Sequence, residues 1–385
     1  MNVNIFSRER PAVKKLASKI FYFRNHSPAH MPQIHRQDRL ATLHEVAARA
    51  GVSHQTVSRV INDSPRVAEH TRGRVLKAVA ELDYRPNKAA RNLVSKRSSL
   101  IGVITFATHF YGPAHILTSI DQAARNFGYR ILLASLSDPS PELVDLAARD
   151  LIAHGVEGII VNVPIELDPV RIQPSFRGVP AVVMDADGKN RVATAALDNE
   201  AGSHLATRHL AQLGHSKIAC ISGLLAWRCG RLRQRAWQRT LQALRLAPGP
   251  VVEGDWSAEG GYRATRKLLE IGRDNFSAIV VSNDQMALGS LRALHEAGIE
   301  VPAQVSLVGF DNIPEAAFFD PPLTTIDHDF DTVARYSLEY LIQIIRDPAT
   351  PRKHKSLAPK LVCRESTSQF QNCLKPKARR EHSGT

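Results

Sequence analysis

The sequence has few cysteines, and their spacing excludes two common roles. Its 385 residues contain only Cys220, Cys229, Cys363 and Cys373. No two of them stand in the C-x-x-C spacing of a structural zinc site, so a metal site is not indicated. They are also too sparse for the disulfide framework of a small secreted domain. We therefore expect a protein of the reducing cytoplasm.

Long apolar runs and nucleotide-binding motifs are also missing. No run approaches the roughly 18 apolar residues of a membrane span. The apolar stretch at residues 20–23 is too short for the core of a signal peptide. Neither a G-x-G-x-x-G fingerprint nor a P-loop occurs, so no nucleotide cofactor is expected. The chain does have 43% hydrophobic residues, enough over this length to bury a core in two or three domains.

The excess positive charge is confined to the first quarter of the chain. Residues 1–38 carry 7 Lys/Arg against 2 Asp/Glu, and residues 39–97 carry 12 against 5. Residues 98–385 are nearly balanced, at 31 against 30, although the whole chain has a formal net charge of +13. This distribution indicates that the N-terminal quarter of the chain binds a polyanion such as nucleic acid. A basic surface that is only exposed to solvent would have the same composition, so that alternative stays open.

Residues 1–38 form a basic N-terminal extension without clear periodicity, and two explanations stay open. The extension is either a disordered basic arm or an over-extended gene start whose true initiation is Met31. Mass spectrometry of the native N-terminus distinguishes them, because a peptide from upstream of Met31 excludes the second explanation.

Residues 39–85 are expected to form an all-α helix-turn-helix domain. Apolar residues recur at helical spacing from Leu43 to Ala50, and Gly51 ends that helix. Ser53 is suited to cap a second helix over residues 54–62. A third helix is expected over about residues 68–82.

The second helix has the side chains that a recognition helix needs near its N-terminus. Gln55 can make a paired contact with adenine, and Arg59 can make one with guanine. His54 precedes Gln55 at the start of the same expected helix. Taken singly, these residues are better explained as the ordinary solvated surface of a small helical domain.

Over residues 99–365 the sequence consists of short apolar runs that alternate with amphipathic segments. This alternation predicts an α/β core of two parallel-sheet lobes. The expected strands are residues 101–106, 130–134, 158–163, 181–184, 217–222, 278–282 and 305–309. The expected helices include residues 116–127, 142–154, 202–213 and 286–297. Residues 366–385 are interpreted as a basic polar tail without the heptad periodicity of a coiled coil.

Polar residues follow several of the expected strands, at the edge where parallel sheets bind ligands. Asp185, Asn283, Asp284 and Asp311 come directly after apolar runs, and Asn162 lies near the end of its own run. A sugar needs carboxylates, amides and a guanidinium for its hydroxyls, and an aromatic plate for its C–H face. The sequence therefore offers the donors and acceptors of a sugar site.

Arg233 and Trp256 would supply the guanidinium and the aromatic plate of that site. Each of these residues also has a structural explanation that involves no ligand. An Asp or Asn after a strand is often a helix cap, and a lone Trp is often part of the core. Arg233 lies in an arginine-rich stretch that suits a solvated helix face.

Several segments resemble one family of regulators. Residues 46–62, VAARAGVSHQTVSRVIN, resemble the DNA-binding signature of the lac repressor family, and residues 79–96, VAELDYRPNKAARNLVSK, resemble its continuation. The likeness extends through GDWSAEGG, VSNDQMALGSLRALHEAG, VSLVGFDN and PPLTTI, from about residue 43 to 364. The resemblance implies a transcription regulator with a periplasmic-binding-protein-like type I core, and not an enzyme. It also implies DNA contacts by His54, Gln55, Thr56, Ser58, Arg59, Asn62, Asn87 and Leu93.

Residues 86–98 are expected to be a hinge helix and linker. The segment has helix-forming residues and Asn87 as a cap, but a lone helix this short is only marginal in water. We therefore expect it to fold only when DNA and a second subunit support it. The resemblance implies that Leu93 enters the minor groove as an apolar wedge, whereas most leucines would pack on their own domain.

The resemblance also implies the residues of an effector site. Phe106 and Phe110 stand where the most similar family member has a small hydroxyl residue and a leucine, and His328 stands where it has a glutamine. These departures leave the identity of a galactoside-like sugar open. The implied effector-binding residues are Pro113, Ile116, Asn162, Asp185, Arg233, Trp256, Asn283, Asp311, His328 and Phe330.

The implied mechanism is a population shift in a homodimer. The form with ordered hinge helices binds a palindromic operator, and a sugar inducer favours a form that separates the hinges. A co-repressor ligand, as in the purine branch of the family, would reverse the sign. Because the tail lacks heptads, we expect a dimer rather than a tetramer. Two other functions are possible for such a core. A secreted sugar-binding protein is disfavoured by the DNA-reading segment, and an enzyme is disfavoured because no nucleophile-and-base set occurs.

Overall fold

The computed structural model describes residues 41–85, 97–164, 173–186 and 193–370. The chain divides into two compact units, residues 1–91 and 92–385, and each is described by itself. The predictions for the extension 1–38 and for Asn87 and Leu93 lie outside the described residues. None of the helices in the described ranges has the length and apolar character to cross a lipid bilayer.

The first unit has the three predicted helices, α2 (Leu43–Ala50), α3 (His54–Ile61) and α4 (Glu69–Glu81). Thr42 and Glu45 form a reciprocal capping box at the start of α2, and Ser53 caps α3 by accepting from the backbone of its third residue. Gly51 ends α2 with a φ of +64°, a conformation that favours glycine. Val46, Val57 and Val75 are fully buried between the helices. A few apolar residues thus hold this small unit together.

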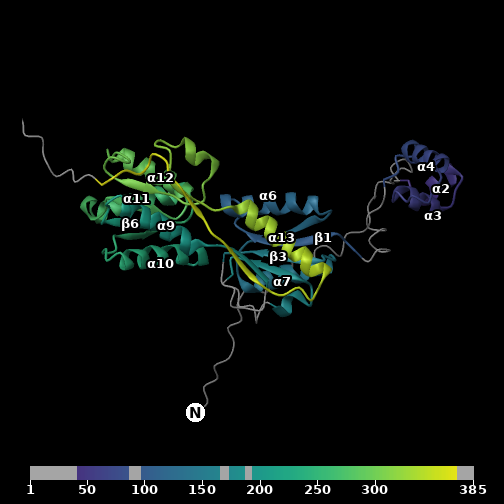
Figure 1. Cartoon of the computed structure of the whole chain (residues 1–385), viewed down its shortest axis with the longest axis horizontal. Helices are drawn as coiled ribbons and strands as arrows, with labels where there is room; N and C mark the ends of the chain where they lie inside the picture. The colour runs from purple at the N-terminus through teal and green to yellow at the C-terminus, as the bar shows by residue number, and fades with distance from the viewer. Residues whose placement is uncertain (1–40, 86–96, 165–172, 187–192, 371–385) are drawn as a thin grey trace, which may run out of the picture. The chain divides into compact units, whose positions relative to one another are not determined.

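The N-terminal lobe of the second unit is a six-stranded parallel sheet in the order β11-β5-β4-β3-β1-β2. One face packs against α6 (Tyr111–Asn126) and α13 (Phe330–Arg346), and the other against α7 (Pro141–Ala153) (Figure 1). The strands are β1 (Leu100–Phe106), β2 (Arg130–Leu136), β3 (Gly158–Asn162), β4 (Ala181–Met184), β5 (Ala193–Leu197) and β11 (His354–Leu357).

The C-terminal lobe is a four-stranded parallel sheet in the order β7-β6-β8-β9. Its strands are β6 (Ile218–Ser222), β7 (Val251–Glu253), β8 (Ala278–Val281) and β9 (Ser306–Val308). The helices α9 (Asn199–Gln212) and α10 (Arg228–Ala243) cover one face, and α11 (Ala258–Ile271) and α12 (Asp284–Glu296) cover the other (Figure 1). Short 3-10 helices occur at η2 (Gln173–Phe176), η3 (Arg273–Asn275) and η4 (Pro314–Phe318).

The chain passes between the two lobes three times. It crosses after β5, after β10 (Thr325–Asp327), and before β12 (Lys360–Val362), which pairs antiparallel with β10. The predicted end of the core at residue 365 is wrong, because Ser366 is fully buried and its hydroxyl donates to the Leu307 carbonyl oxygen. Phe370 also donates its backbone N–H to the Leu213 carbonyl oxygen at 2.8 Å, so the core extends at least to this residue.

Three helices begin two or more residues earlier than the sequence predicted. α6 begins at Tyr111 rather than residue 116, because Pro113 fits the first turn of a helix, where its missing N–H costs nothing. α9 begins at Asn199 rather than residue 202, after Asp198 accepts from the Ala201 N–H as its cap. α12 begins at residue 284 rather than 286 for the same reason, since the residue before it is a capping asparagine.

Candidate functional sites

The exposed face of α3 carries the predicted DNA-reading residues. The side chains of His54, Gln55, Arg59 and Asn62 are exposed, while those of Thr56 and Ser58 are half-buried. The Thr56 hydroxyl lies 3.0 Å from the capping hydroxyl of Ser53, so it also belongs to the cap. Gln55 and Arg59 are one helical turn apart, and both therefore project from the same face of α3.

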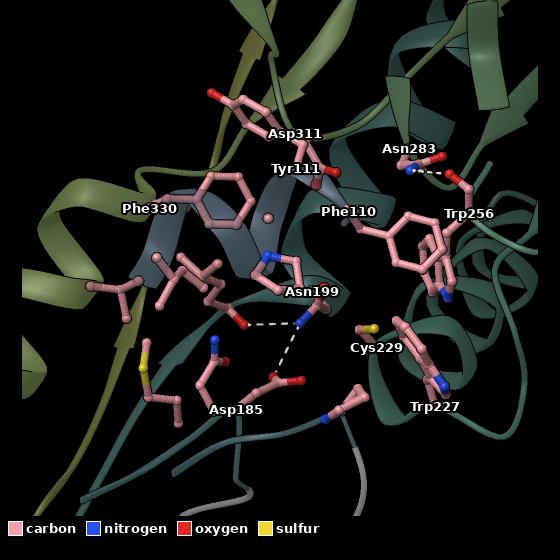
Figure 2. A pocket seen from close by; sticks show the side chains of 18 of the residues that line it. Phe110, Tyr111, Asp185, Asn199, Trp227, Cys229, Trp256, Asn283, Asp311 and Phe330 are labelled. Atoms are coloured by element: carbon pink, nitrogen blue, oxygen red, sulfur yellow. Dashed lines mark hydrogen bonds between the residues drawn. The ribbon is translucent and has the colours of Figure 1, made fainter. Parts of the chain in front are cut away.

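A pocket lies at the carboxyl ends of the strands, where residues of both lobes meet (Figure 2). Its free space, including the part open to solvent, is about 840 Å³. The lining includes nine of the ten predicted effector residues: Pro113, Ile116, Asn162, Asp185, Arg233, Trp256, Asn283, Asp311 and Phe330. Sequence positions that are more than two hundred residues apart, such as Pro113 and Phe330, are thus brought into one cavity.

Arg233, on the second turn of α10, is the centre of the polar contacts. Its Nε donates to Asn199 Oδ1 at 2.8 Å, its Nη1 donates to the carbonyl oxygen of Ser282, and its Nη2 lies 3.4 Å from Asp311 Oδ1. The guanidinium carbon lies 3.7 Å from the ring centroid of Phe310, so the plane of the arginine stacks on an aromatic face. Because Arg233 is only 8% exposed, these contacts hold it in one orientation.

Asp185 and Asn199 extend this network to the N-terminal lobe. Asn199 Nδ2 donates to Asp185 Oδ1 at 3.2 Å (Figure 2), and Arg228 Nη1 donates to the same oxygen at 3.1 Å. Asn199 therefore links Asp185 to Arg233 by using both ends of its amide. Asn199 was not predicted from the sequence, because the strand that it follows, β5, is rich in alanine and was not recognised as an apolar run.

Three pocket residues have backbone angles in the left-handed region, where side chains are uncommon. The φ angles are +56° at Asp185, +72° at Trp256 and +105° at Asp311. Strained backbone that persists in a folded protein is concentrated at ligand sites, because the surrounding contacts hold it there. At Trp256 one such contact is the Asn283 amide, which donates to the Trp256 carbonyl oxygen at 3.0 Å (Figure 2).

Asn283 has a structural duty besides its place in the pocket. Its Oδ1 accepts from the Met286 N–H at 3.0 Å and caps α12. The ordinary interpretation of an Asn after a strand is therefore correct, and it does not conflict with the predicted role, since the same side chain lines the pocket. Asp284, in contrast, is not among the described residues that line the pocket. It is fully buried, and its carboxyl group accepts hydrogen bonds from Thr325 Oγ1 and the Ile313 N–H.

Burial sets the ionisation of these carboxyl groups. Burial raises the pKa of Asp185 and of Asp311 to about 6. The neighbouring arginines lower these pKa values in part: Arg228 and Arg233 act on Asp185, and Arg233 acts on Asp311. Burial, followed by the charge of Asp311, raises the pKa of Asp284 to about 8. A carboxyl whose pKa is higher in the folded state than in the unfolded state binds its proton more tightly when folded.

We expect Asp284 to make the core less stable as pH rises. The folded state holds a proton that the unfolded chain releases above pH 3.8, so the free energy of unfolding falls between about pH 4 and 8, by up to ~1.4 kcal/mol per pH unit. Asp284→Asn should reduce this slope between pH 6 and 8. Urea unfolding followed by tryptophan fluorescence measures it, with exposed Asp274→Asn as the matched control. An unchanged slope in Asp284→Asn would contradict this assignment.

His328 is the predicted effector residue that the pocket does not include. Its side chain is 2% exposed and packs edge-on against Phe310, with the ring centroids 4.7 Å apart. Among the described residues, it is therefore placed behind the side chains that line the cavity. Burial and the charge of Arg233 lower the pKa of His328 well below its usual value, so the imidazole is neutral. Its predicted contact with the effector is not supported by its place in the fold.

An aromatic wall, which we define as Phe106, Phe110, Trp227 and Trp256, was recognised only in part from the sequence. Trp227 was missed; it is the N-cap residue of α10 and stacks on Trp256 at a centroid distance of 5.7 Å. Gly223 makes room for this arrangement, because a Cβ there would lie 2.1 Å from the Trp256 ring. Within the part of the chain that the structure describes, no group of three or more His, Cys, Asp or Glu residues is placed to hold a metal ion.

Two family models match the chain. Residues 42–87 match bacterial regulatory proteins of the lacI family, and residues 207–367 match a periplasmic binding protein-like domain. The lactose operon repressor of Escherichia coli K12 is 36% identical over 327 residues, which are 85% of this chain and 90% of that repressor. The HTH-type transcriptional repressor PurR of Histophilus somni strain 129Pt is 33% identical over 334 residues, or 85% and 99% of the two chains.

A solved structure of similar sequence matches most of this chain. It is the lac repressor dimer bound to operator and the anti-inducer ONPF, with a TM-score of 0.81 at 36% sequence identity. The match covers 86% of this chain and 100% of that chain. The predicted fold class is thereby confirmed.

Proposed function

This chain belongs to the lacI family of bacterial regulatory proteins and is a DNA-binding transcriptional repressor, and we propose that a small, galactoside-like sugar releases it from the operators of sugar-utilisation genes. The proposed readers of the operator are the exposed residues of α3. The proposed effector site is the pocket between the lobes. No step of bond making or breaking is required of the protein.

One observation carries the sugar proposal: four hydrogen-bonding side chains converge on the pocket beside aromatic faces. This polar set, defined as Asp185, Asn199, Arg233 and Asp311, contains two carboxylates, one amide and one guanidinium. Sugar hydroxyls both donate and accept, so they match such a mixture, while the C–H face of a sugar packs on an aromatic ring. A ligand that bridges Asp185 in one lobe and Asp311 in the other would favour one relative arrangement of the lobes.

The proposed release is a population shift in a homodimer. Ligand binding changes the arrangement of the lobes, and the linkers 86–98 of two subunits then no longer pair on DNA. A homodimer is supported by the lac repressor, which is 36% identical to this chain and was solved as a dimer bound to operator. A dimer also fits the two half-sites of a palindromic operator.

A DNA-retention assay tests the proposed function. The purified chain is mixed with the DNA that lies upstream of its own gene, and the complex is challenged with a panel of monosaccharides, disaccharides and glycosides. We expect at least one sugar to release the DNA, and a purine base to leave it bound. Tighter binding with a purine base, and no response to any sugar, would contradict the proposal.

A further inference from the structure

Positive charge gathers at one edge of the N-terminal lobe. Its strands are parallel, so the segments that lead into β1, β2, β3, β4 and β11 meet at the amino edge of the sheet. α13 starts at the pocket, which Phe330 lines, and ends at this opposite edge (Figure 1). In these described segments, the acidic residues are Glu157 and Asp347. The basic residues, which we call the basic edge, are Arg97, Arg130, Arg177, Arg346, Arg352 and Lys353.

Members of the basic edge from different segments lie close together. Arg97, from the segment before β1, and Arg352, from the segment before β11, line one surface depression together with Glu157. Burial and the charge of Glu157 raise the pKa of Tyr129, while the charges of Arg97 and Arg346 lower it, so both arginines lie near this tyrosine. The fold thus joins charges that are about 250 residues apart in the sequence into one surface.

The carboxylates of this edge serve the backbone rather than the arginines. Glu157 accepts from the N–H of Ser99 at 2.8 Å, and Asp347 accepts from a backbone N–H at 2.9 Å. Arg130 and Arg352 each donate to a neutral backbone carbonyl oxygen, at 3.5 and 2.9 Å. All six basic residues are exposed. Their charge is therefore presented to solvent, where a polyanion can meet it.

Protection of the sheet edges explains only part of this surface. Charged side chains beside an edge strand hinder pairing with other chains. That accounts for Arg130 and Lys353, which stand at the starts of the two edge strands, β2 and β11. It does not account for Arg97, Arg177 and Arg346, which lie on other segments. General basicity does not account for them either, because residues 98–385 carry 31 basic against 30 acidic side chains.

The chain tethers the basic edge to the DNA-binding domain. Arg85 is the last described residue of the first unit, and Arg97 is the first described residue of the second. Eleven residues separate them, and an extended chain spans at most about 3.6 Å per residue, or roughly 40 Å. Duplex DNA carries one phosphate charge for about every 1.7 Å of its axis. Along the chain, the basic edge is therefore the first part of the core to come after a domain that holds a dense polyanion.

We propose that the basic edge contacts phosphates of the bound DNA and forms a second, sequence-independent contact surface besides α3. The inference goes beyond the reading of bases by α3 and involves no effector. Lysine and arginine side chains that neutralise phosphates release counterions, so their contacts strengthen binding and make it depend on salt. Phosphate contacts carry no direct sequence information, so the contribution should be similar on operator and unrelated DNA.

The salt dependence of DNA binding tests the proposal. The full chain and a triple variant, Arg346→Gln with Arg352→Gln and Lys353→Gln, are titrated by fluorescence anisotropy over a series of KCl concentrations. The duplexes are the DNA upstream of the chain's own gene and an unrelated sequence. Each phosphate contact that is lost should reduce the slope of log affinity against log salt by about 0.9. We expect the triple variant to lose roughly 2–3 in slope per subunit, and roughly tenfold or more in affinity at low salt on both duplexes.

Two further variants separate a local contact from stability and from net charge. Arg352→Gln alone changes one exposed position before β11 and should reduce the slope by about 0.9 per subunit, whether or not the triple variant folds. The matched control removes the same charge from exposed positions of the C-terminal lobe: Arg208→Gln, Arg245→Gln and Lys267→Gln. It should leave the slope nearly unchanged. An unchanged slope in both basic-edge variants, an equal loss in the control, or a loss confined to the operator would overturn the proposal.

Discussion

Replacing Arg233 with alanine is expected to abolish the response to the effector while the chain still binds its operator. Arg233 is the cation that faces Asp311 and orients Asn199, and all three side chains line the pocket. Hydrogen bonds to charged groups contribute about 1.5–3 kcal/mol each. We therefore expect the effector concentration for half-release to rise about 100-fold or more, measured by DNA retention across an effector titration.

The same substitution should also destabilise the core, because it leaves a buried carboxylate without its partner. Breaking a buried ion pair from one side costs about 3–5 kcal/mol. Arg233→Lys is the second variant: it keeps a positive charge near Asp311 but cannot contact Asn199, Ser282 and Asp311 together. Arg235→Ala, an exposed position on the same helix, is the matched control. If both Arg233 variants fold and keep the normal effector response, the assignment of the pocket is wrong.

Replacing Gln55 or Arg59 with alanine should weaken operator binding and relax its sequence specificity. Both side chains are exposed on one face of α3, whose opposite face is fixed by buried Val57 and Val60. A paired contact with a base contributes about 1–3 kcal/mol of discrimination. We expect a loss of roughly 5- to 150-fold on the operator and little change on unrelated DNA, by fluorescence anisotropy at fixed salt.

Lys77→Ala separates base reading from general charge. Lys77 is exposed on α4, so its loss removes one positive charge from the same domain without touching α3. We expect a small effect that is similar on operator and unrelated DNA. A result in which Arg59→Ala and Lys77→Ala weaken both DNAs equally would show that α3 does not read bases in the proposed way.

The sequence predicted the parts of the fold that depend on local patterns. The helical stripe from Leu43, the stop at Gly51 and the cap at Ser53 placed α2 and α3 within one residue of their observed ends. The apolar run at residues 181–184 coincides with β4. β5 was missed because its sequence, ATAAL, is rich in alanine, which has little preference for strands; its place between β4 and β11 is fixed by tertiary packing.

The pocket was predicted where polar residues end apolar runs, and missed where contacts depend on distant segments. Asp185, Asn283 and Asp311 were found in this way and do line the cavity. Trp227 was overlooked because an arginine-rich helix follows it, and only the fold brings it onto Trp256. His328 was assigned to the effector by its matched position, yet packing against Phe310 places it behind the described lining.

Thermodynamic reciprocity between effector and DNA tests the central claim most directly. If one pocket controls DNA release, the factor by which the effector weakens operator binding must equal the factor by which the operator weakens effector binding. Operator affinity is measured with and without saturating effector by anisotropy, and effector affinity with and without operator by calorimetry. Our account predicts equal factors of at least about five, and effector affinity that does not change when the operator is added would contradict it.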